Sequence, residues 1–175
     1  MITIYFDLDG LLCDYDSYWG SDKTFDRIRF KSEVMDNKMF EKLRPLSTGF
    51  DLFWGVHDYL IDNRIEYNFQ ILSSLGAPND IELAEEAARQ KAEWVRGYFG
   101  NFIGNLNFCS HKGTKKYFAT PNSILLDDTN ENVYDFNECH GYGILFNNDM
   151  DFNTILKEVT DTIDIVQGKI ERKIY

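Results

Sequence analysis

Five short apolar runs, each bounded by polar residues or glycine, recur along the chain and predict β-strands. Runs of this length without strict alternation are typical of strands buried on both faces of a parallel sheet. They cover residues 2–6, 67–72, 105–109, 123–126 and 142–146. The first run stops at Asp7-Leu8-Asp9-Gly10, a sequence that favours a loop.

The segments between these runs show helical periodicity. The clearest helix is predicted over 80–99, where apolar side chains recur at spacings of three or four. These side chains are Ile81, Ala84, Ala88, Ala92, Val95 and Phe99, and Asp80 and Gly100 suit the two helix ends. Further helices are predicted over residues 50–63, 113–119, 130–137 and 151–166. Strands alternating with helices predict an α/β fold with a doubly wound parallel sheet.

Residues 14–46 interrupt the alternation with many aromatic and charged residues. Helical patterns lie near 22–33 and 36–43, so we predict a small helical cap inserted after the first strand. The core then comprises residues 1–13 and 47–175. Aromatic residues of so small a cap fill its interior more often than they contact a ligand, and both roles stay open here.

Size and composition place the chain among globular proteins. Its 175 residues suffice for one domain, or one domain with a small insertion, and 43% hydrophobic residues allow a sizeable core. No apolar run approaches the ~18 residues of a membrane span, and the first residues lack a signal-peptide pattern. We therefore expect a cytoplasmic protein with no membrane partner. The three cysteines lack Cys-x-x-Cys spacing, which argues against a zinc site or disulfides.

The formal net charge of −11 limits the kinds of molecule that the protein can bind without a cation. Stable nucleic-acid binding depends largely on Lys and Arg neutralising phosphates, so this charge argues against it. A phosphorylated small molecule would need a cation or local basic residues to offset the negative field. A site made of carboxylates would bring its own cation. The sequence is also compatible with a homodimer.

Polar residues follow four of the predicted strands. In an open parallel sheet, ligands bind outside the carboxyl ends of the strands. The residues at those ends are Asp7 and Asp9, Ser73 and Ser74, Lys112, and Asp127 and Asp128. Singly, each has an ordinary explanation as a polar turn, a helix N-cap or a surface lysine. Together they indicate phosphoryl transfer.

Each residue type suits that chemistry. Mg²⁺ prefers a few carboxylate oxygens and retains several waters. A carboxylate beside the ion can attack phosphorus, and a second carboxyl can protonate the leaving group and then deprotonate water. A lysine and a hydroxyl group stabilise charge on the transferring oxygens. We therefore expect Mg²⁺ as the cofactor and a small phosphomonoester as the substrate.

Four short segments resemble, in order, the motifs of the haloacid dehalogenase-like (HAD) phosphohydrolase superfamily. They are Phe6-Asp7-Leu8-Asp9-Gly10-Leu11, Ile71-Leu72-Ser73-Ser74, Lys112, and Leu125-Leu126-Asp127-Asp128. The resemblance covers nearly the whole chain and implies a Rossmann-like core. Lys115 competes with Lys112 for the third motif, although Lys112 is better placed relative to the end of the third predicted strand.

The resemblance also implies a role for each motif residue. Asp7 would be the phosphorylated nucleophile, and Asp9 the general acid and base. The implied phosphate ligands are Ser73, Ser74 and Lys112. The implied metal ligands are Asp7, Asp9 through its backbone carbonyl, and Asp128, with Asp127 in support.

A closer resemblance is to the cytosolic 5′(3′)-deoxyribonucleotidase group and its small phage and bacterial relatives. It is carried by residues 7–15, by Leu43-Arg44-Pro45-Leu46, by residues 93–100 (Glu-Trp-Val-Arg-Gly-Tyr-Phe-Gly) and by residues 141–146. It implies a nucleoside monophosphate as substrate. Tyr15 stands where that group has an aromatic residue that stacks on the base.

Two other functions stay open. One is a phosphatase for another small phosphomonoester or for a 3′-phosphate. The other is a non-enzymatic phospho-acceptor module, because receiver domains also place a phosphorylatable Asp and a lysine at strand ends. The second acid, Asp9, favours an enzyme, since a receiver protonates no leaving alkoxide. A cap that excludes water favours an enzyme as well.

Overall fold

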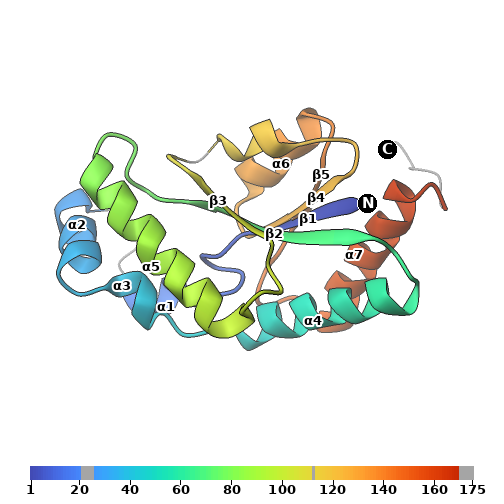
Figure 1. Cartoon of the computed structure of the whole chain (residues 1–175), viewed down its shortest axis with the longest axis horizontal. Coiled ribbons are helices and arrows are strands. Elements are labelled where there is room, and N and C mark those ends of the chain that lie inside the picture. Colours follow the sequence, from blue (N-terminus) through green and yellow to red (C-terminus); the bar gives the residue numbers. More distant parts are fainter. Residues whose placement is uncertain (21–25, 112, 170–175) are drawn as a thin grey trace.

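The computed structural model describes residues 1–20, 26–111 and 113–169. Within them, five parallel strands form one sheet in the order β3-β2-β1-β4-β5 (Figure 1). The strands are Ile2–Phe6 (β1), Tyr67–Ser74 (β2), Asn105–Cys109 (β3), Ser123–Asp127 (β4) and Tyr142–Leu145 (β5). The predicted α/β fold with a parallel sheet is confirmed. The chain passes from β1 to β2 on one side, whereas β4 lies on the other, so the strand order reverses next to β1.

Strand β2 extends beyond its predicted end and includes Ser73 and Ser74. Ser73 lies opposite Phe108 and Ser74 opposite Cys109 in the pairing with β3. The two serines are therefore part of the strand itself, whereas the sequence placed them just after its end.

Helices cover both faces of the sheet (Figure 1). Helices α4, α5 and α7 lie on one face, while α6 and the 3₁₀ helix η1 lie on the other. Their bounds are Ser47–Asp62 (α4), Ile81–Phe99 (α5), Phe152–Val166 (α7), Asn130–Glu138 (α6) and Lys115–Phe118 (η1). Among the described residues, no helix has the length and apolar character needed to cross a membrane.

The α-helix predicted over 113–119 is wrong. This segment forms only the single 3₁₀ turn η1, and Ala119 after it is already extended. The residue before Pro121 is disfavoured in a helical conformation, so the turn has no room to continue.

The side chains of β1 alternate between two hydrophobic cores. Phe6 points toward α4, with its ring centroid 5.0 Å from that of Phe53 and 5.2 Å from that of Phe69. Tyr5 points to the opposite face and packs edge-on against Phe136 of α6. Burying an aromatic side chain of this kind contributes about 1.5–3 kcal/mol, so both faces help to fix the position of β1. The end of β1 is therefore a rigid platform.

The buried face of α5 matches its predicted stripe only in part. Val95 and Phe99 are buried as predicted, and Ala84 and Ala88 are half-buried against the core. Ile81 is 79% exposed, whereas the buried side chains include Leu83, Ala87, Gln90, Lys91 and Trp94. Two of these are polar, and each finds partners in the interior. Gln90 donates to the carbonyl oxygen of Val34 at 2.7 Å and accepts from the backbone N–H of Phe40 at 3.1 Å. Hydrogen bonding thus permits burial that a hydrophobic pattern does not anticipate.

Between β1 and α4, the described part of the chain forms three short helices, namely Tyr15–Trp19 (α1), Arg27–Met35 (α2) and Met39–Lys42 (α3). The chain leaves and returns side by side, because Asp14 N–H donates to Arg44 O at 2.8 Å and Leu46 N–H to Leu12 O at 2.9 Å. Helices α2 and α3 pack on α5, and their buried side chains join the same hydrophobic cluster as the sheet. Part of the first predicted cap helix, residues 22–25, lies outside the described residues. The boundaries of a separate cap domain stay a prediction.

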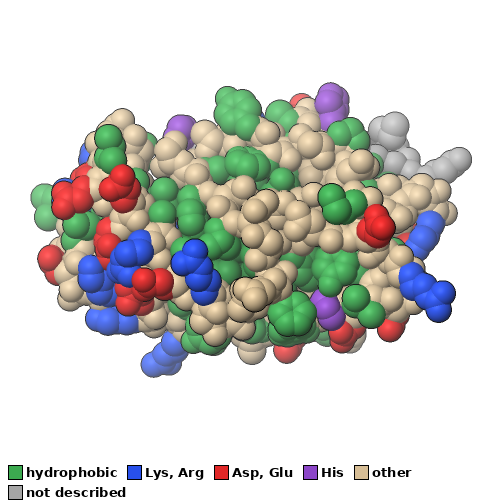
Figure 2. Space-filling view, viewed as in Figure 1, with side chains coloured by type: hydrophobic (Ala, Val, Ile, Leu, Met, Phe, Trp, Pro, Cys, Tyr) green, Lys and Arg blue, Asp and Glu red, His purple; other side chains and the backbone are tan. Residues whose placement is uncertain are grey.

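Charged side chains of both signs are intermixed at the end of the molecule that α2, α3 and α5 form (Figure 2). The ion pairs between these helices are Lys31–Asp80 (2.9 Å), Lys38–Glu86 (2.7 Å) and Arg89–Glu41 (2.7 Å). Exposed pairs of this kind contribute about 0–1 kcal/mol each. The buried apolar side chains therefore supply most of the attachment.

Candidate active site

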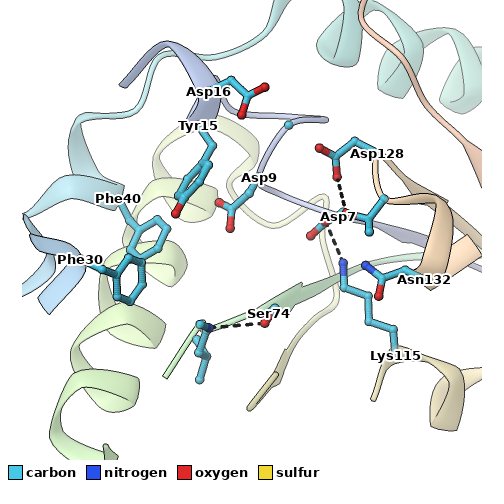
Figure 3. Close-up of a pocket in the computed structure, with 14 residues that line it drawn as sticks. Asp7, Asp9, Tyr15, Asp16, Phe30, Phe40, Ser74, Lys115, Asp128 and Asn132 are labelled. Atoms are coloured by element: carbon cyan, nitrogen blue, oxygen red, sulfur yellow. Dashed lines mark hydrogen bonds and ion pairs between the residues drawn. The ribbon is translucent and has the colours of Figure 1, made fainter. Parts of the chain in front are cut away.

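Three carboxylates converge where β1 and β4 end, next to the point at which the strand order reverses. Asp7 follows β1, Asp127 is the last residue of β4, and Asp128 follows it. One oxygen from each lies within 4.8 Å of the others, with Asp7 and Asp127 buried and Asp128 exposed. Figure 3 shows the carboxyl groups of Asp7 and Asp128 close together on the same side of the cavity. A few carboxylate oxygens at one open site are what Mg²⁺ requires.

Gly10 allows Asp128 to approach the turn that follows β1. Its φ is +78°, and a Cβ there would lie 2.0 Å from Asp128 Oδ2. Loss of hydration and the nearby carboxylates, Asp7 foremost, raise the pKa of Asp128 to about 7. A bound cation would relieve this repulsion, so the donor set fits Mg²⁺.

Lys115 links two of the three carboxylates. Its Nζ lies 2.8 Å from Asp7 Oδ2 and 2.6 Å from Asp127 Oδ2. Burial acts to lower the pKa of Lys115, but the carboxylates of Asp7 and Asp127 outweigh it and hold the pKa above its ordinary value. Lys112, the lysine preferred from the sequence, lies outside the described residues. Lys115, the competing lysine, is thus a charged partner of the proposed nucleophile.

Asp127 is held by more partners than Asp7 or Asp128. Besides Lys115, its carboxylate accepts hydrogen bonds from the backbone N–H of Thr129 at 2.9 Å and from Asn132 Nδ2 at 3.1 Å. With its oxygens so engaged, Asp127 suits a supporting role beside the metal better than direct coordination. Asn132 was not among the predicted site residues. Its one sequence signal is its position in the first turn of the helix after Asp127-Asp128.

Asp9 points away from the carboxylate cluster toward a second lysine. Lys91 Nζ lies 2.5 Å from Asp9 Oδ2, and its side chain is fully buried. Desolvation raises the pKa of Asp9 above its ordinary value, against the opposing effect of Lys91. Lys91 was not predicted, because a lysine within an amphipathic helix normally belongs to the solvent face. Asp7 and Asp9 therefore have different partners although only one residue separates them.

The two serines at the end of β2 differ in exposure. Ser73 is buried, and its hydroxyl oxygen accepts a hydrogen bond from Lys91 at 3.0 Å. Ser74 lines the cleft, where its hydroxyl oxygen accepts from the backbone N–H of Gly76 at 3.4 Å (Figure 3). Both lie beside the carboxylates, and phosphate binding by them stays a prediction.

The site opens into a cavity of about 320 Å³ with two chemically different walls. Asp7, Asp9, Asp128 and Lys115 form the charged wall, and Tyr15, Phe30 and Phe40 form an aromatic wall opposite it (Figure 3). Tyr15, for which the resemblance implied contact with the base, lies on the cavity, and its role in substrate binding stays a prediction. A ligand with one anionic end and one flat apolar end would match both walls.

Fold and site together define a class. This is an α/β protein with an acidic centre at the switch point of a parallel sheet, suited to a divalent cation and an anionic ligand.

No known protein-family model and no curated protein matches the sequence. Among solved structures, the chain is similar to a haloacid dehalogenase-like family hydrolase from Streptococcus pneumoniae, with 14% identity over 90% of each chain and a TM-score of 0.47. It is also similar to a predicted HAD-like family hydrolase from Porphyromonas gingivalis, with 13% identity over 91% of this chain and 98% of that one and a TM-score of 0.48. These are likenesses of overall fold, and nothing about the site follows from them.

Proposed function

We propose that this protein is a magnesium-dependent phosphomonoester hydrolase that forms an aspartyl-phosphate on Asp7. The observation that carries the proposal is the separation of two carboxylates by their partners. Asp7 lies in the cluster with Lys115 and Asp128, whereas Asp9 is held apart by Lys91. One carboxylate placed for attack and another placed for proton transfer are what a two-step hydrolysis needs. The motif resemblance to HAD phosphohydrolases supports the same assignment.

In the first step, a carboxylate oxygen of Asp7 attacks phosphorus as the bond from phosphorus to the leaving oxygen breaks. Asp9 gives its proton to that oxygen, so the leaving group departs as an alcohol. In the second step, Asp9 takes a proton from water, whose oxygen attacks phosphorus and releases Asp7 and inorganic phosphate. Lys115, within 2.8 Å of Asp7, offsets negative charge at the nucleophile throughout.

Asp7, Asp128 and the backbone carbonyl of Asp9 would hold Mg²⁺, with Asp127 in support. The ion would supply positive charge to the transferring phosphoryl oxygens. It would also offset part of the net charge of −11 at the place where an anionic substrate must bind.

Turnover of p-nitrophenyl phosphate with and without Mg²⁺ tests the reaction class. We expect Asp7→Asn to abolish turnover. Asp9→Asn should remove most of it even with this substrate, because the second step still needs Asp9 to take a proton from water, while Mg²⁺ binding persists. Asp58→Asn, an exposed aspartate on α4, is the matched control and should behave as the wild type. Wild-type turnover in Asp7→Asn would refute the nucleophile. A stable phospho-Asp7 without turnover would indicate a phospho-acceptor module instead.

For the substrate, we propose a nucleoside monophosphate. The aromatic wall of Tyr15, Phe30 and Phe40 lies opposite the carboxylates across the cavity, which suits a base at one end and a phosphate at the other. The resemblance to the deoxyribonucleotidase group supports this choice. A panel of deoxynucleoside 5′- and 3′-monophosphates, ribonucleotides and sugar phosphates would rank the candidates. Equal or better turnover of sugar phosphates would overturn the nucleotidase proposal and leave a phosphatase for another small phosphomonoester.

A further inference from the structure

Lys91 is a fully buried ammonium group with three oxygen partners. Its Nζ donates to Asp9 Oδ2 at 2.5 Å, to Ser74 O at 2.8 Å and to Ser73 Oγ at 3.0 Å. An ammonium group has three N–H donors, so each one has a partner. The Nζ also lies 4.4 Å from the ring centroid of Phe40, which covers it from the cap side. Removing an ammonium from water is costly unless it is paired, and here the pairing is complete.

These contacts fix Lys91 in place and, through it, Asp9. Lys91 lies on α5, which is anchored nearby because its side chains Trp94 and Val95 are buried in the main hydrophobic core. The other Asp9 oxygen, Oδ1, accepts from the thiol of Cys13 at 3.6 Å. The Asp9 carboxyl group is therefore held from both sides, and Lys91 connects it to the end of β2.

Lys91 has a different place from the other buried lysine. Lys115 lines the cavity and pairs with Asp7 and Asp127, whereas Lys91 lies behind Asp9 and Ser74 and is not among the described residues that line the cavity. Lys91 is thus placed to act on a substrate through the groups that it holds, of which the Asp9 carboxyl group is the ionisable one. This distinguishes it from a phosphate ligand.

We propose that Lys91 is a positioning residue, which holds the carboxyl group of Asp9 where it must deliver a proton to the leaving oxygen. The inference rests on the proposed hydrolase function. Without Lys91, Asp9 would keep its chemistry but lose the geometry that proton transfer requires, since such transfer depends on hydrogen-bond reach of the leaving atom.

The dependence of kcat/KM on the leaving group distinguishes a positioning role of Lys91 from a purely structural one, because a structural defect would lower kcat/KM equally for all substrates. An alkyl phosphate expels a strongly basic alkoxide and needs a proton from Asp9, whereas p-nitrophenyl phosphate expels a weakly basic phenolate and scarcely needs one. General acid catalysis contributes roughly 10²–10⁴-fold. We therefore expect Lys91→Met to reduce kcat/KM for an alkyl phosphate by at least about tenfold more than for p-nitrophenyl phosphate.

Gln90→Met is the matched control. Gln90 is a fully buried polar residue next to Lys91 on α5, but it hydrogen-bonds to Val34 and Phe40 of the cap helices and to Glu86 of α5. Gln90→Met should lower stability and leave the ratio of the two kcat/KM values unchanged. In an Asp9→Asn background, Lys91→Met should cause no further change in that ratio, because the proton donor is already lost.

Turnover of both substrates by the wild-type protein is measured first. If the wild type turns over neither substrate, the proposed hydrolase function itself is refuted, and the positioning role with it. With an active wild type, an equal loss on both substrates in Lys91→Met would overturn the positioning role. If Lys91→Met does not fold by circular dichroism, Lys91→Gln, which keeps a hydrogen-bond donor, takes its place in the same comparison. If neither variant folds, Lys91 is a structural residue and the proposal is overturned.

Discussion

Replacing Gly10 by alanine should weaken Mg²⁺ binding strongly and lower the stability of the fold only slightly. The new Cβ would lie 2.0 Å from Asp128 Oδ2 and 2.6 Å from Asp128 Cγ. The carboxyl group must retreat by roughly 1.4 Å to reach ordinary van der Waals contact. Metal ligands tolerate displacements of only about 0.2 Å, so a shift of this size removes Asp128 from the metal. We expect the affinity for Mg²⁺ to fall by about 10–100-fold or more, by comparison with the loss of supporting partners at metal sites.

The stability of Gly10→Ala should change much less. The side chain of Asp128 is exposed and free to turn away, so the main cost is the positive φ of +78° at an alanine. That cost is about 1–2 kcal/mol, or roughly 2–8 °C in Tm for a chain of this size. Gly100→Ala is the matched control, because Gly100 also has a positive φ, but its new methyl group would have no atom of the described residues within 4 Å beyond its immediate chain neighbours.

The assay combines isothermal titration with Mg²⁺ and thermal unfolding without it. Gly100→Ala should lose similar stability and keep its Mg²⁺ affinity. If Gly10→Ala binds Mg²⁺ as tightly as Gly100→Ala does, then Asp128 is not a ligand of the metal.

Three further outcomes are expected. Lys115→Met should abolish phosphatase activity and lower the free energy of unfolding by about 3–5 kcal/mol without Mg²⁺, because Asp7 and Asp127 stay buried without their cation; a stable, active variant would contradict this. The pKa of Asp128 is raised to about 7 in the folded protein, against about 4 in the unfolded chain, so protonated Asp128 stabilises the fold at low pH and this stabilisation is lost as the pH rises through 7. A cation should then offset the charge of the ionised carboxylate, and added Mg²⁺ should raise Tm more at pH 8 than at pH 5. A pH-independent increment would count against that carboxylate as a ligand. Tyr15→Ala should raise KM for nucleoside monophosphates and leave KM for a small alkyl phosphate unchanged; equal effects would remove Tyr15 from base binding.

The parallel sheet and the convergence of the carboxylates could both be predicted from the sequence, and for the same reason. Buried parallel strands appear as short apolar runs, and such strands bring their carboxyl ends to one edge. Asp7 and Asp128 could thus be assigned to one place although they are far apart in the chain. The sheet and the convergence of Asp7, Asp127 and Asp128 are what the structure shows.

Lys115 was one of two candidates from the sequence, but two other partners of the carboxylates at the site did not follow from it. Lys91 and Asn132 are polar residues within helices, and a hydrophobic pattern assigns such residues to the solvent face. Each is buried because its hydrogen bonds are satisfied by Asp9 or by Asp127, and these contacts depend on tertiary structure. For the same reason, the fully buried face of α5 includes Ala87 and Lys91, whereas the predicted Ala88 and Ala92 are only half-buried.

The aromatic wall of the cavity also limits how the substrate range can evolve. Phe30 and Phe40 face the cavity, yet each is only 2% exposed and belongs to the continuous hydrophobic cluster that joins cap and sheet. Truncating a buried phenylalanine costs about 3–5 kcal/mol, a large part of the stability of a typical domain. New specificities are therefore more accessible through Tyr15 and Asp16, which line the same cavity and are not fully buried. Selection for a new substrate and selection for a folded protein act on the same two phenylalanines.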